Sequence, residues 1–146
     1  MKRTSTGLII ALAVIALDQF TKYLIVTSLS PYASIDVFQF LNIVNVRNTG
    51  AAFGMFRGIG SWFFIAVSSA AIVFVTVLLI RNAYHYIGLS LILGGAVGNL
   101  IDRLVYGKVV DFIDFFVGSF HWPAFNVADS SLTIGIGIIL LTSIKK

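Results

Sequence analysis

The chain alternates between long apolar runs and shorter polar connections. Apolar residues dominate four segments, at about residues 7–27, 59–80, 84–106 and 127–144. Each is close to the roughly 20 residues that an α-helix needs to cross about 30 Å of hydrocarbon. The pattern therefore predicts a polytopic α-helical membrane protein with four transmembrane helices. An even number of crossings puts both ends of the chain on the same side.

The first apolar run also resembles a secretory signal peptide, because "MKRTSTGLIIALAVIAL" has a basic start and an apolar centre. No small-x-small cleavage site follows it, and "DQFTKYLIV" continues the run. We interpret this segment as a retained helix.

The two longer connections have patterns of their own. Around "IDVFQFLNIVNV", β-branched and aromatic residues alternate roughly with others, which predicts short strands on the outer face within about residues 32–58. Residues 107–125 are rich in aromatic side chains and close with Trp122 and Pro123, as is typical of a segment lying in the headgroup layer. No repeat or linker is evident, so we treat residues 1–146 as one domain.

Composition supports the membrane assignment. Hydrophobic residues make up 58% of the chain and charged residues 11%, whereas soluble domains are about one quarter charged. The net charge of +4 comes from dispersed basic residues without a basic stripe, so nucleic acid is not an expected partner. The positive-inside rule places both termini in the cytoplasm, because basic residues precede the first run, separate the second from the third and follow the last: Lys2, Arg3, Arg81, Lys145 and Lys146.

Residue types restrict the possible chemistry. The chain has no cysteine, and its two histidines, His85 and His121, lack metal-ligand spacing, so we expect neither a metal nor another cofactor. The glycines of "LSLILGGAVGNL" do not form a dinucleotide loop. Ser90, Gly94 and Gly98 instead make a small-xxx-small ridge that favours close helix packing.

Polar residues of the apolar spans gather at one depth. Counting about 1.5 Å per residue from the basic ends places Asp18 and Lys22 about 22 to 29 Å up, Asn99 to Arg103 about 27 to 33 Å, and Asp129 about 24 Å. Asp111 and the "RNTGAAFG" loop belong to the outer connections and can join this layer. The sequence therefore predicts a polar site near the outer leaflet.

Structural explanations exist for several of these residues. Asp18 can pair with Lys22, and Asp102 with Arg103, as intramembrane charges held for neutrality. Asp129 or Ser130 can cap the last helix, because Asp and Ser are favoured at that position. Asn126 lies one turn before Asp129.

Two aspartates suggest catalysis. Asp111 lies within "VVDFIDFF", and such an apolar setting raises the pKa of a carboxyl group. If Asp111 meets Asp129, two carboxyls sharing a proton can activate water and protonate a leaving amine. Peptide hydrolysis by Cys, HExxH or GxSxG chemistry has no matching motif here. A small proton or ion pathway is the alternative, and a purely structural subunit is a third.

Four motifs in order resemble those of the bacterial lipoprotein signal peptidases, also called signal peptidase II. They are "DQFTK", "RNTGAAFG", "GGAVGNLIDRLVYGKVVDFIDF" and "FNVADSS", and the resemblance covers nearly the whole chain. It implies a four-helix aspartyl endopeptidase with a small outer β-cradle and a short periplasmic helix. Its catalytic pair would be Asp111 and Asp129, with Asp114 a bystander. The residues that would support or line the site are Asp18, Lys22, Asn48, Gly50, Asn99, Asp102, Arg103 and Asn126.

The resemblance also implies the substrate and the location. The substrate would be a prolipoprotein whose cysteine carries diacylglycerol, cut on the N-terminal side of that cysteine. Membrane lipid and globomycin-type inhibitors would be further partners, and we expect the enzyme to act as a monomer. It would lie in the bacterial cytoplasmic (inner) membrane, with its active site near the outer, periplasmic leaflet.

Overall fold

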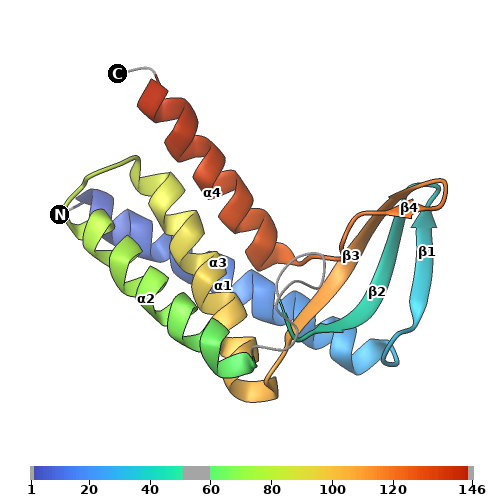
Figure 1. Ribbon diagram of the computed structural model, residues 1–146. Helices are drawn as coiled ribbons and strands as arrows, with labels where there is room; N and C mark the ends of the chain where they lie inside the picture. The colour runs from blue at the N-terminus through green and yellow to red at the C-terminus, as the bar shows by residue number, and fades with distance from the viewer. Residues whose placement is uncertain (1, 51–59, 145–146) are drawn as a thin grey trace.

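The computed structural model describes residues 2–50 and 60–144 and has four long helices with one small sheet (Figure 1). The helices are α1 (Lys2–Ser28), α2 (Ser61–Ile80), α3 (Tyr86–Tyr106) and α4 (Val127–Ile144). All four are long and apolar enough to cross a membrane. The prediction of four apolar helices, made from hydropathy alone, is confirmed.

Helix α3 forms the centre of the bundle. It contacts α1, α2 and α4, and more than half of its apolar window is buried (56%), against 11–17% for the other three. The outer helices instead expose large apolar side chains, as expected of surfaces that face lipid. Among those more than half exposed are Leu12, Phe20, Trp62, Phe74 and Leu141.

Small residues on α3 allow the neighbouring helices to approach closely. A Cβ atom on Gly94 would lie 2.7 Å from Cβ of Val14, and one on Gly98 would lie 2.6 Å from Oδ2 of Asp18. Ser90 continues this row, 2.7 Å from where a Cβ of Gly7 would stand. The predicted packing ridge is therefore correct, and α1 is the helix that it contacts.

The sheet has four antiparallel strands in the order β1-β2-β3-β4. They are β1 (Ser34–Phe38), β2 (Leu41–Asn48), β3 (Val109–Val117) and β4 (Phe120–His121). The central strands β2 and β3 pair although α2 and α3 separate them in the sequence. Gly107, with φ +68°, ends α3 in a left-handed cap and turns the chain into β3.

The sheet extends farther along the sequence than predicted. Strands were expected only within residues 32–58, with residues 107–125 lying in the headgroup layer, but β3 and β4 occupy much of that second segment. Its aromatic and β-branched residues suit a strand as well as an interface. Outside the four long helices the described residues contain no further helix, and residues 51–59 lie outside the described part. The short periplasmic helix stays a prediction.

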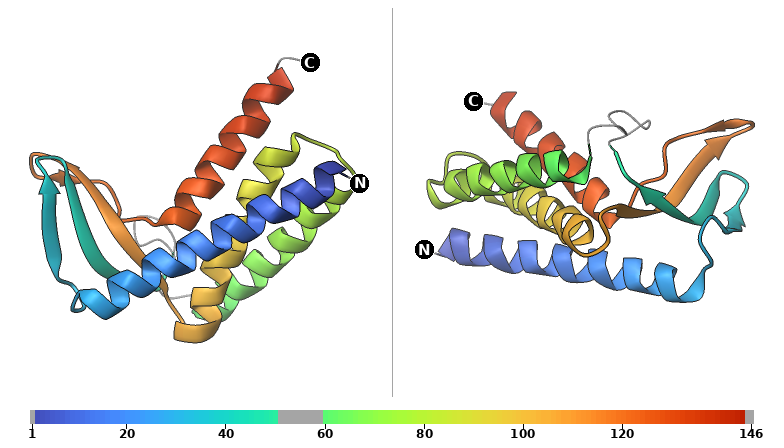
Figure 2. Two further views of the ribbon diagram at one scale, coloured as in Figure 1. Left: turned by 180° about the vertical axis from the view of Figure 1, so that it is seen from behind. Right: turned by 60° about the horizontal axis from the view of Figure 1, so that its bottom comes forward.

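The connections place the sheet and the chain ends at opposite ends of the bundle. α1 ends, α2 begins, α3 ends and α4 begins at the end that carries the sheet. Both termini and the turn between α2 and α3 lie at the other end (Figures 1 and 2). The helix ends that carry Asp18, Asn99 and Asp129 are thus brought together next to β3.

Candidate active site

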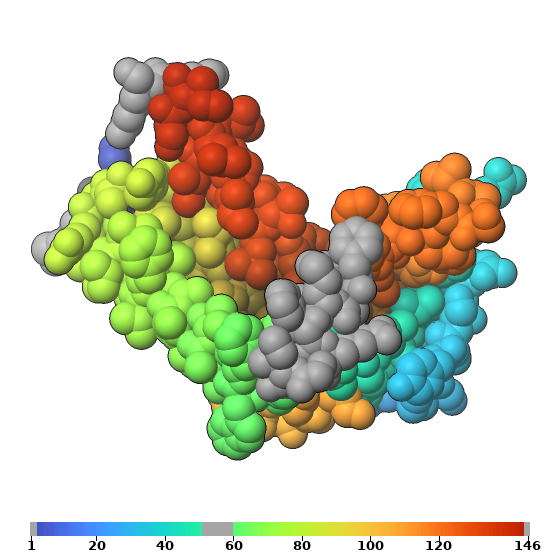
Figure 3. Space-filling model, in the orientation of Figure 1, coloured from blue at the N-terminus to red at the C-terminus, as the bar shows by residue number. Residues whose placement is uncertain are grey.

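Asp111 and Asp129 line one groove, although they come from different elements. The groove has a volume of about 760 Å³ and lies among α2, α3, α4 and the start of β3. Figure 3 shows the surface hollowed between α4 and the end of the sheet that carries β3 and β4. Asp111 lies on β3 and is 2% exposed, while Asp129 lies in the first turn of α4 and is partly buried. The structure therefore brings together the two carboxyls that the sequence indicated.

A β-bulge sets the direction of Asp111. The adjacent amides of Phe112 and Ile113 both donate to the carbonyl of Phe125, at 3.0 and 2.9 Å. Such a two-to-one pairing interrupts the alternation of side chains along a strand. Asp111 and Asp114, three residues apart, consequently line the same hollow surface of the sheet.

Two buried asparagines connect the two carboxyls. Asn126 Nδ2 donates to Oδ1 of Asp111 at 2.8 Å, and Asn99 Nδ2 donates to Oδ1 of Asp129 at 2.8 Å. Asn126 Nδ2 also lies 3.2 Å from Oδ1 of Asn99, so a hydrogen-bonded chain joins the two acids. Oδ2 of Asp129 has no hydrogen-bond partner among the described residues. Of the four carboxylate oxygens of the two acids, it is the one that accepts no hydrogen bond from this part of the chain.

Asn48 and Gly50 hold Asp111 from the other side. Asn48 ends β2, and its Nδ2 donates to Oδ2 of Asp111 at 3.0 Å. The amide of Gly50 donates to Oδ1 of Asn48 at 2.9 Å, which fixes the orientation of the asparagine side chain. Both oxygens of Asp111 therefore accept hydrogen bonds from side-chain amides.

The environment of Asp111 raises the pKa of its carboxyl group to about 7. Burial contributes most, because it disfavours the charged form, and the nearby charge of Asp129 adds to it. The hydrogen bonds from Asn48 and Asn126 and the charge of Lys22 act in the opposite direction. At neutral pH both the protonated and the ionised form of this carboxyl are accessible.

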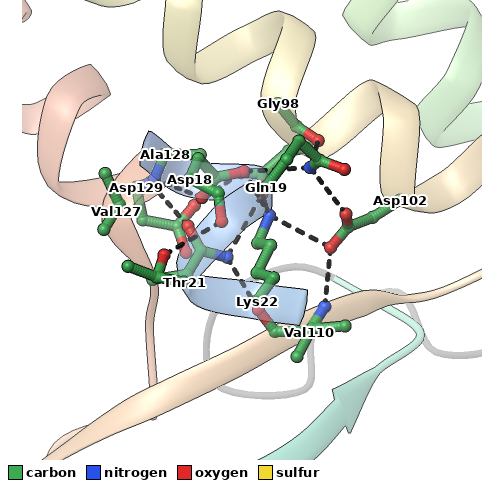
Figure 4. Close-up of polar contacts among 12 residues, drawn as sticks. Asp18, Gln19, Thr21, Lys22, Gly98, Asp102, Val110, Val127, Ala128 and Asp129 are labelled. Carbon is green, nitrogen blue, oxygen red and sulfur yellow. Dashed lines mark hydrogen bonds and ion pairs between the residues drawn. The ribbon is translucent and has the colours of Figure 1, made fainter. Parts of the chain in front are cut away.

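Lys22 forms the centre of a buried charge cluster between α1 and α3 (Figure 4). Its Nζ lies 2.8 Å from Oδ2 of Asp18 and 3.0 Å from Oδ2 of Asp102, and it donates to Oδ1 of Asn99 at 3.1 Å. The two acids are completely or almost completely buried, and the lysine is 3% exposed. An ion cluster with so little water contact requires such close partners on every side.

Each acid of this cluster also fixes the backbone beside one candidate catalytic residue. Oδ2 of Asp102 accepts from the amide of Val110, directly before Asp111, at 2.9 Å. Oδ1 of Asp18 accepts from the amide of Ala128, directly before Asp129, at 2.9 Å. Lys22 is therefore linked through Asp102 to the backbone of β3 and through Asp18 to the start of α4.

Two sequence-based interpretations are wrong. Asp102 pairs with Lys22 and not with Arg103, because adjacent helical residues point in different directions. Arg103 lies over the ring of Phe64 at 5.3 Å, and its Nη1 is 3.4 Å from the carbonyl of Asn99. The cap of α4 is also different, since Oδ1 of Asn126 accepts from the amide of Asp129 at 2.9 Å. Asp129 and Ser130 therefore do not cap this helix.

Gln19 belongs to the cluster and was missed by the sequence analysis. Its Nε2 donates to Oδ1 of Asp102 at 3.0 Å and lies 3.2 Å from both Oδ2 of Asp18 and the carbonyl of Gly98. The available signal was an amide next to Asp18 within an apolar helix, where an unpartnered polar group is unfavourable.

Asp114 lies outside this constellation. His121 Nδ1 is 2.9 Å from its Oδ2, and Asn42 Nδ2 donates to the same oxygen at 3.3 Å. Both partners come from strands adjacent to β3, so the carboxylate of Asp114 forms hydrogen bonds between neighbouring strands of the sheet. Among the residues that the structure describes, no group of three or more His, Cys, Asp or Glu is arranged to hold a metal ion.

Comparison with known proteins gives a consistent result. Residues 10–145 match the family model described as "Signal peptidase (SPase) II". Two proteins named "Lipoprotein signal peptidase" are similar over most of their length. The protein of Thermodesulfovibrio yellowstonii is 46% identical over 91% of this chain and 90% of its own, and that of Brevibacillus brevis is 48% identical over 91% of each.

Solved structures agree with the sequence comparison. Two structures described as a bacterial membrane enzyme, at 2.3 and 1.9 Å resolution, superpose with TM-scores of 0.88 and 0.86. Each is 39% identical in sequence and covers 97% of this chain, with 88% and 94% of its own chain matched. The likeness therefore extends over nearly the whole fold.

Proposed function

The chain belongs to the signal peptidase II family, and we propose that it is an aspartyl protease that removes signal peptides from diacylglyceryl-modified prolipoproteins. The family makes it a membrane protease acting on prolipoproteins. We add to this that the catalytic groups are the carboxyls of Asp111 and Asp129, and that the bond cut lies on the N-terminal side of the lipidated cysteine. Its main support is the pair of carboxyls from β3 and α4, linked through Asn99 and Asn126 in one groove.

In the proposed reaction the pair holds one proton and one negative charge. The ionised carboxylate takes a proton from water, whose oxygen attacks the scissile carbonyl carbon. The protonated carboxyl first polarises that carbonyl and then donates its proton to the departing nitrogen as the carbon–nitrogen bond breaks. One water is consumed, and the products are a signal peptide with a free carboxyl group and a chain with a free amine.

The raised pKa of Asp111 supports this arrangement. A carboxyl with an ordinary pKa would be ionised almost completely at neutral pH and would hold no proton to donate. The pKa of about 7 keeps the proton available under those conditions. Because two interacting acids titrate as a pair, the proton is described as shared by Asp111 and Asp129.

The surroundings of the groove fit a substrate that arrives from the membrane. Most of the surface that lines it is apolar, and the helices contribute Val67, Ala71, Leu132 and Ile134 to that surface. Such walls suit the end of an apolar signal peptide and the acyl chains on the cysteine. We therefore propose cleavage on the N-terminal side of the lipidated cysteine, and we expect globomycin-type inhibitors to occupy this groove.

A proton or ion pathway receives less support from the distribution of charge. A relay needs polar groups through the full depth of the membrane. The buried ionisable residues described in the helices, Asp18, Lys22 and Asp102, lie at the end of the bundle next to the sheet. This placement favours a reaction at one surface of the membrane.

The proposal is tested by cleavage of a defined substrate. The purified protein should release the signal peptide from a diacylglyceryl-modified prolipoprotein, leaving an amine on the lipidated cysteine, as mass spectrometry would show. The same prolipoprotein without diacylglycerol should remain intact, and EDTA should not stop cleavage. Cut sites elsewhere, or activity that disappears on chelation and returns with a metal, would disprove this mechanism.

A further inference from the structure

A second pocket lies on the sheet side of Asp111. It has a volume of about 790 Å³, and we call it the sheet pocket. It shares several lining residues with the groove, so the two hollows meet at the candidate catalytic acid: Asn48, Asp111, Trp122, Pro123 and Ala124. The rest of its wall comes mainly from β2, β3 and β4 and from the residues that flank them, and includes Arg47, Lys108, Asp114 and His121.

The sheet pocket differs in charge from the groove. Arg47 is half-buried with its guanidinium carbon 5.8 Å from the centre of the Tyr106 ring, and Lys108 is exposed. Neither has an ion-pair partner within residues 2–50 and 60–144. The carboxylate of Asp114 is occupied by His121 and Asn42. Two uncompensated cations therefore border a pocket next to the reacting acids.

The substrate of an endopeptidase extends on both sides of the scissile bond. If the proposed function is right, the signal peptide and the acyl chains take the apolar groove. The residues after the cysteine lead away to the part of the lipoprotein outside the membrane, and they need a path past the sheet. The sheet pocket extends from Asp111 along β2, β3 and β4, which makes it the available path.

We propose that the sheet pocket binds the residues that follow the lipidated cysteine and favours acidic over basic side chains there. Arg47 and Lys108 are the specificity-determining residues. This inference rests on the proposed function but concerns a part of the substrate that family membership does not specify. Charge complementarity of this kind acts through moderate, salt-sensitive differences in binding.

The test compares three synthetic diacylglyceryl prolipopeptides that differ only after the cysteine, with Ser-Asp-Asp, Ser-Ser-Ser or Ser-Lys-Lys. The wild-type protein should cleave the acidic peptide with a kcat/KM about three to ten times that of the basic one, mainly through KM. The ratio should shrink when salt is raised from about 0.05 to 0.5 M. Lys108→Glu should abolish or invert it.

Arg81→Glu is the matched control, because it makes the same change of charge at the opposite end of the bundle and should preserve the ratio. Equal cleavage of the three peptides, or a preference that survives both Lys108→Glu and high salt, would overturn the sheet pocket while leaving the proposed function standing. A preference for anionic over zwitterionic vesicles without any peptide preference would also overturn it and assign the cations to lipid headgroups. No cleavage of any peptide would overturn the proposed function itself.

Discussion

At neutral pH the protonated and ionised forms of Asp111 are close to equally populated, because its pKa is about 7. Burial and the charge of Asp129 favour its protonated form, whereas two amide donors and Lys22 favour the ionised form. The result is a pKa of about 7 for a carboxyl that would ordinarily titrate near 4. A general acid works best when its pKa lies near the working pH, so this balance is what the proposed reaction needs.

The first prediction is a loss of activity at alkaline pH. Because the pKa of Asp111 is raised, the pair keeps its proton below about pH 7 and loses it as the pH rises further. With both carboxyls ionised no acid remains to protonate the leaving amine, so kcat/KM should fall about tenfold for each pH unit above the transition. Initial cleavage rates between pH 5.5 and 9.5 would measure this.

Asn48→Ala should move the alkaline limb of that profile to higher pH. The substitution removes a donor that favours the ionised form of Asp111, so the pKa rises further. Asn42→Ala is the control, since Asn42 donates to Asp114 instead. A limb that stays in place in Asn48→Ala, or moves equally in both variants, would argue against Asp111 as the titrating group.

At the level of elements, three segments depend on one buried cation. Lys22 on α1 pairs with Asp18 and Asp102, and these acids accept hydrogen bonds from the amides of Ala128 at the start of α4 and Val110 on β3. The backbone amide of the residue before each candidate catalytic aspartate is thus held by an acid of the cluster, which fixes the position of the aspartate. The cluster orients the site without lining the groove.

Lys22→Met should therefore reduce both stability and activity. It leaves two buried carboxylates without their cation, and breaking such a pair costs about 3–5 kcal/mol. The midpoint of thermal unfolding in detergent should fall markedly, together with kcat. Adding Asp102→Asn removes one unpaired charge and should recover part of the stability. An unchanged unfolding midpoint in Lys22→Met would contradict this role.

Gly98→Ala tests the contact between α1 and α3. Its new Cβ would lie 2.6 Å from Oδ2 of Asp18, the oxygen that contacts Lys22. Overpacking of this kind typically destabilises by about 1–3 kcal/mol. Gly137→Ala adds the same methyl group where nothing lies within 4 Å, and should be neutral or slightly stabilising. Equal unfolding temperatures for the two variants would be inconsistent with this packing.

The sequence predicted those elements whose signal is local. Hydropathy and length were enough for the four helices, and helical spacing was enough for Asp18 with Lys22. The partner of Asp102 was not predictable in this way, because Lys22 is 80 residues away and reaches it only when α1 packs on α3. The extent of the sheet was missed because β3 pairs with a strand on the far side of two helices.

In the candidate site, too, features with a local sequence signal were predicted and contacts between distant segments were not. Motif resemblance named Asp111 and Asp129, and the structure places both in one groove. The hydrogen-bonded chain through Asn99 and Asn126 depends on a helix, a helix cap and a strand meeting in space. No spacing along the chain encodes such a meeting. Gln19 was overlooked for the same reason, since two of its three partners, Gly98 and Asp102, lie on α3.

At the scale of the whole molecule, the candidate site lies at one end of the bundle and exposed basic residues lie at the other. The chain ends and the turn after α2, with Arg3 and Arg81, lie away from the sheet. The positive-inside rule therefore predicts that the sheet and the groove lie on the outer side of the membrane. This orientation suits a substrate whose mature part lies outside the cell membrane.

Reporter fusions would test the orientation. Alkaline phosphatase, which is active only outside the cytoplasm, should be active when inserted at the turn of Gly118 between β3 and β4. It should be inactive when fused after Lys146. A fluorescent protein that folds only in the cytoplasm should give the opposite pattern. Phosphatase activity at the C-terminal fusion would reverse the proposed orientation.

The turnover of purified single variants shows whether Asp111 and Asp129 act as a catalytic pair. Asp111→Asn and Asp129→Asn should each lower kcat for a diacylglyceryl-modified prolipoprotein by at least about a thousandfold, as expected when half of an acid–base pair is lost. Asp114→Asn, with an acid three residues away on the same strand, should keep substantial activity. Near-native cleavage by folded Asp111→Asn or Asp129→Asn would show that the two carboxyls are not the catalytic pair.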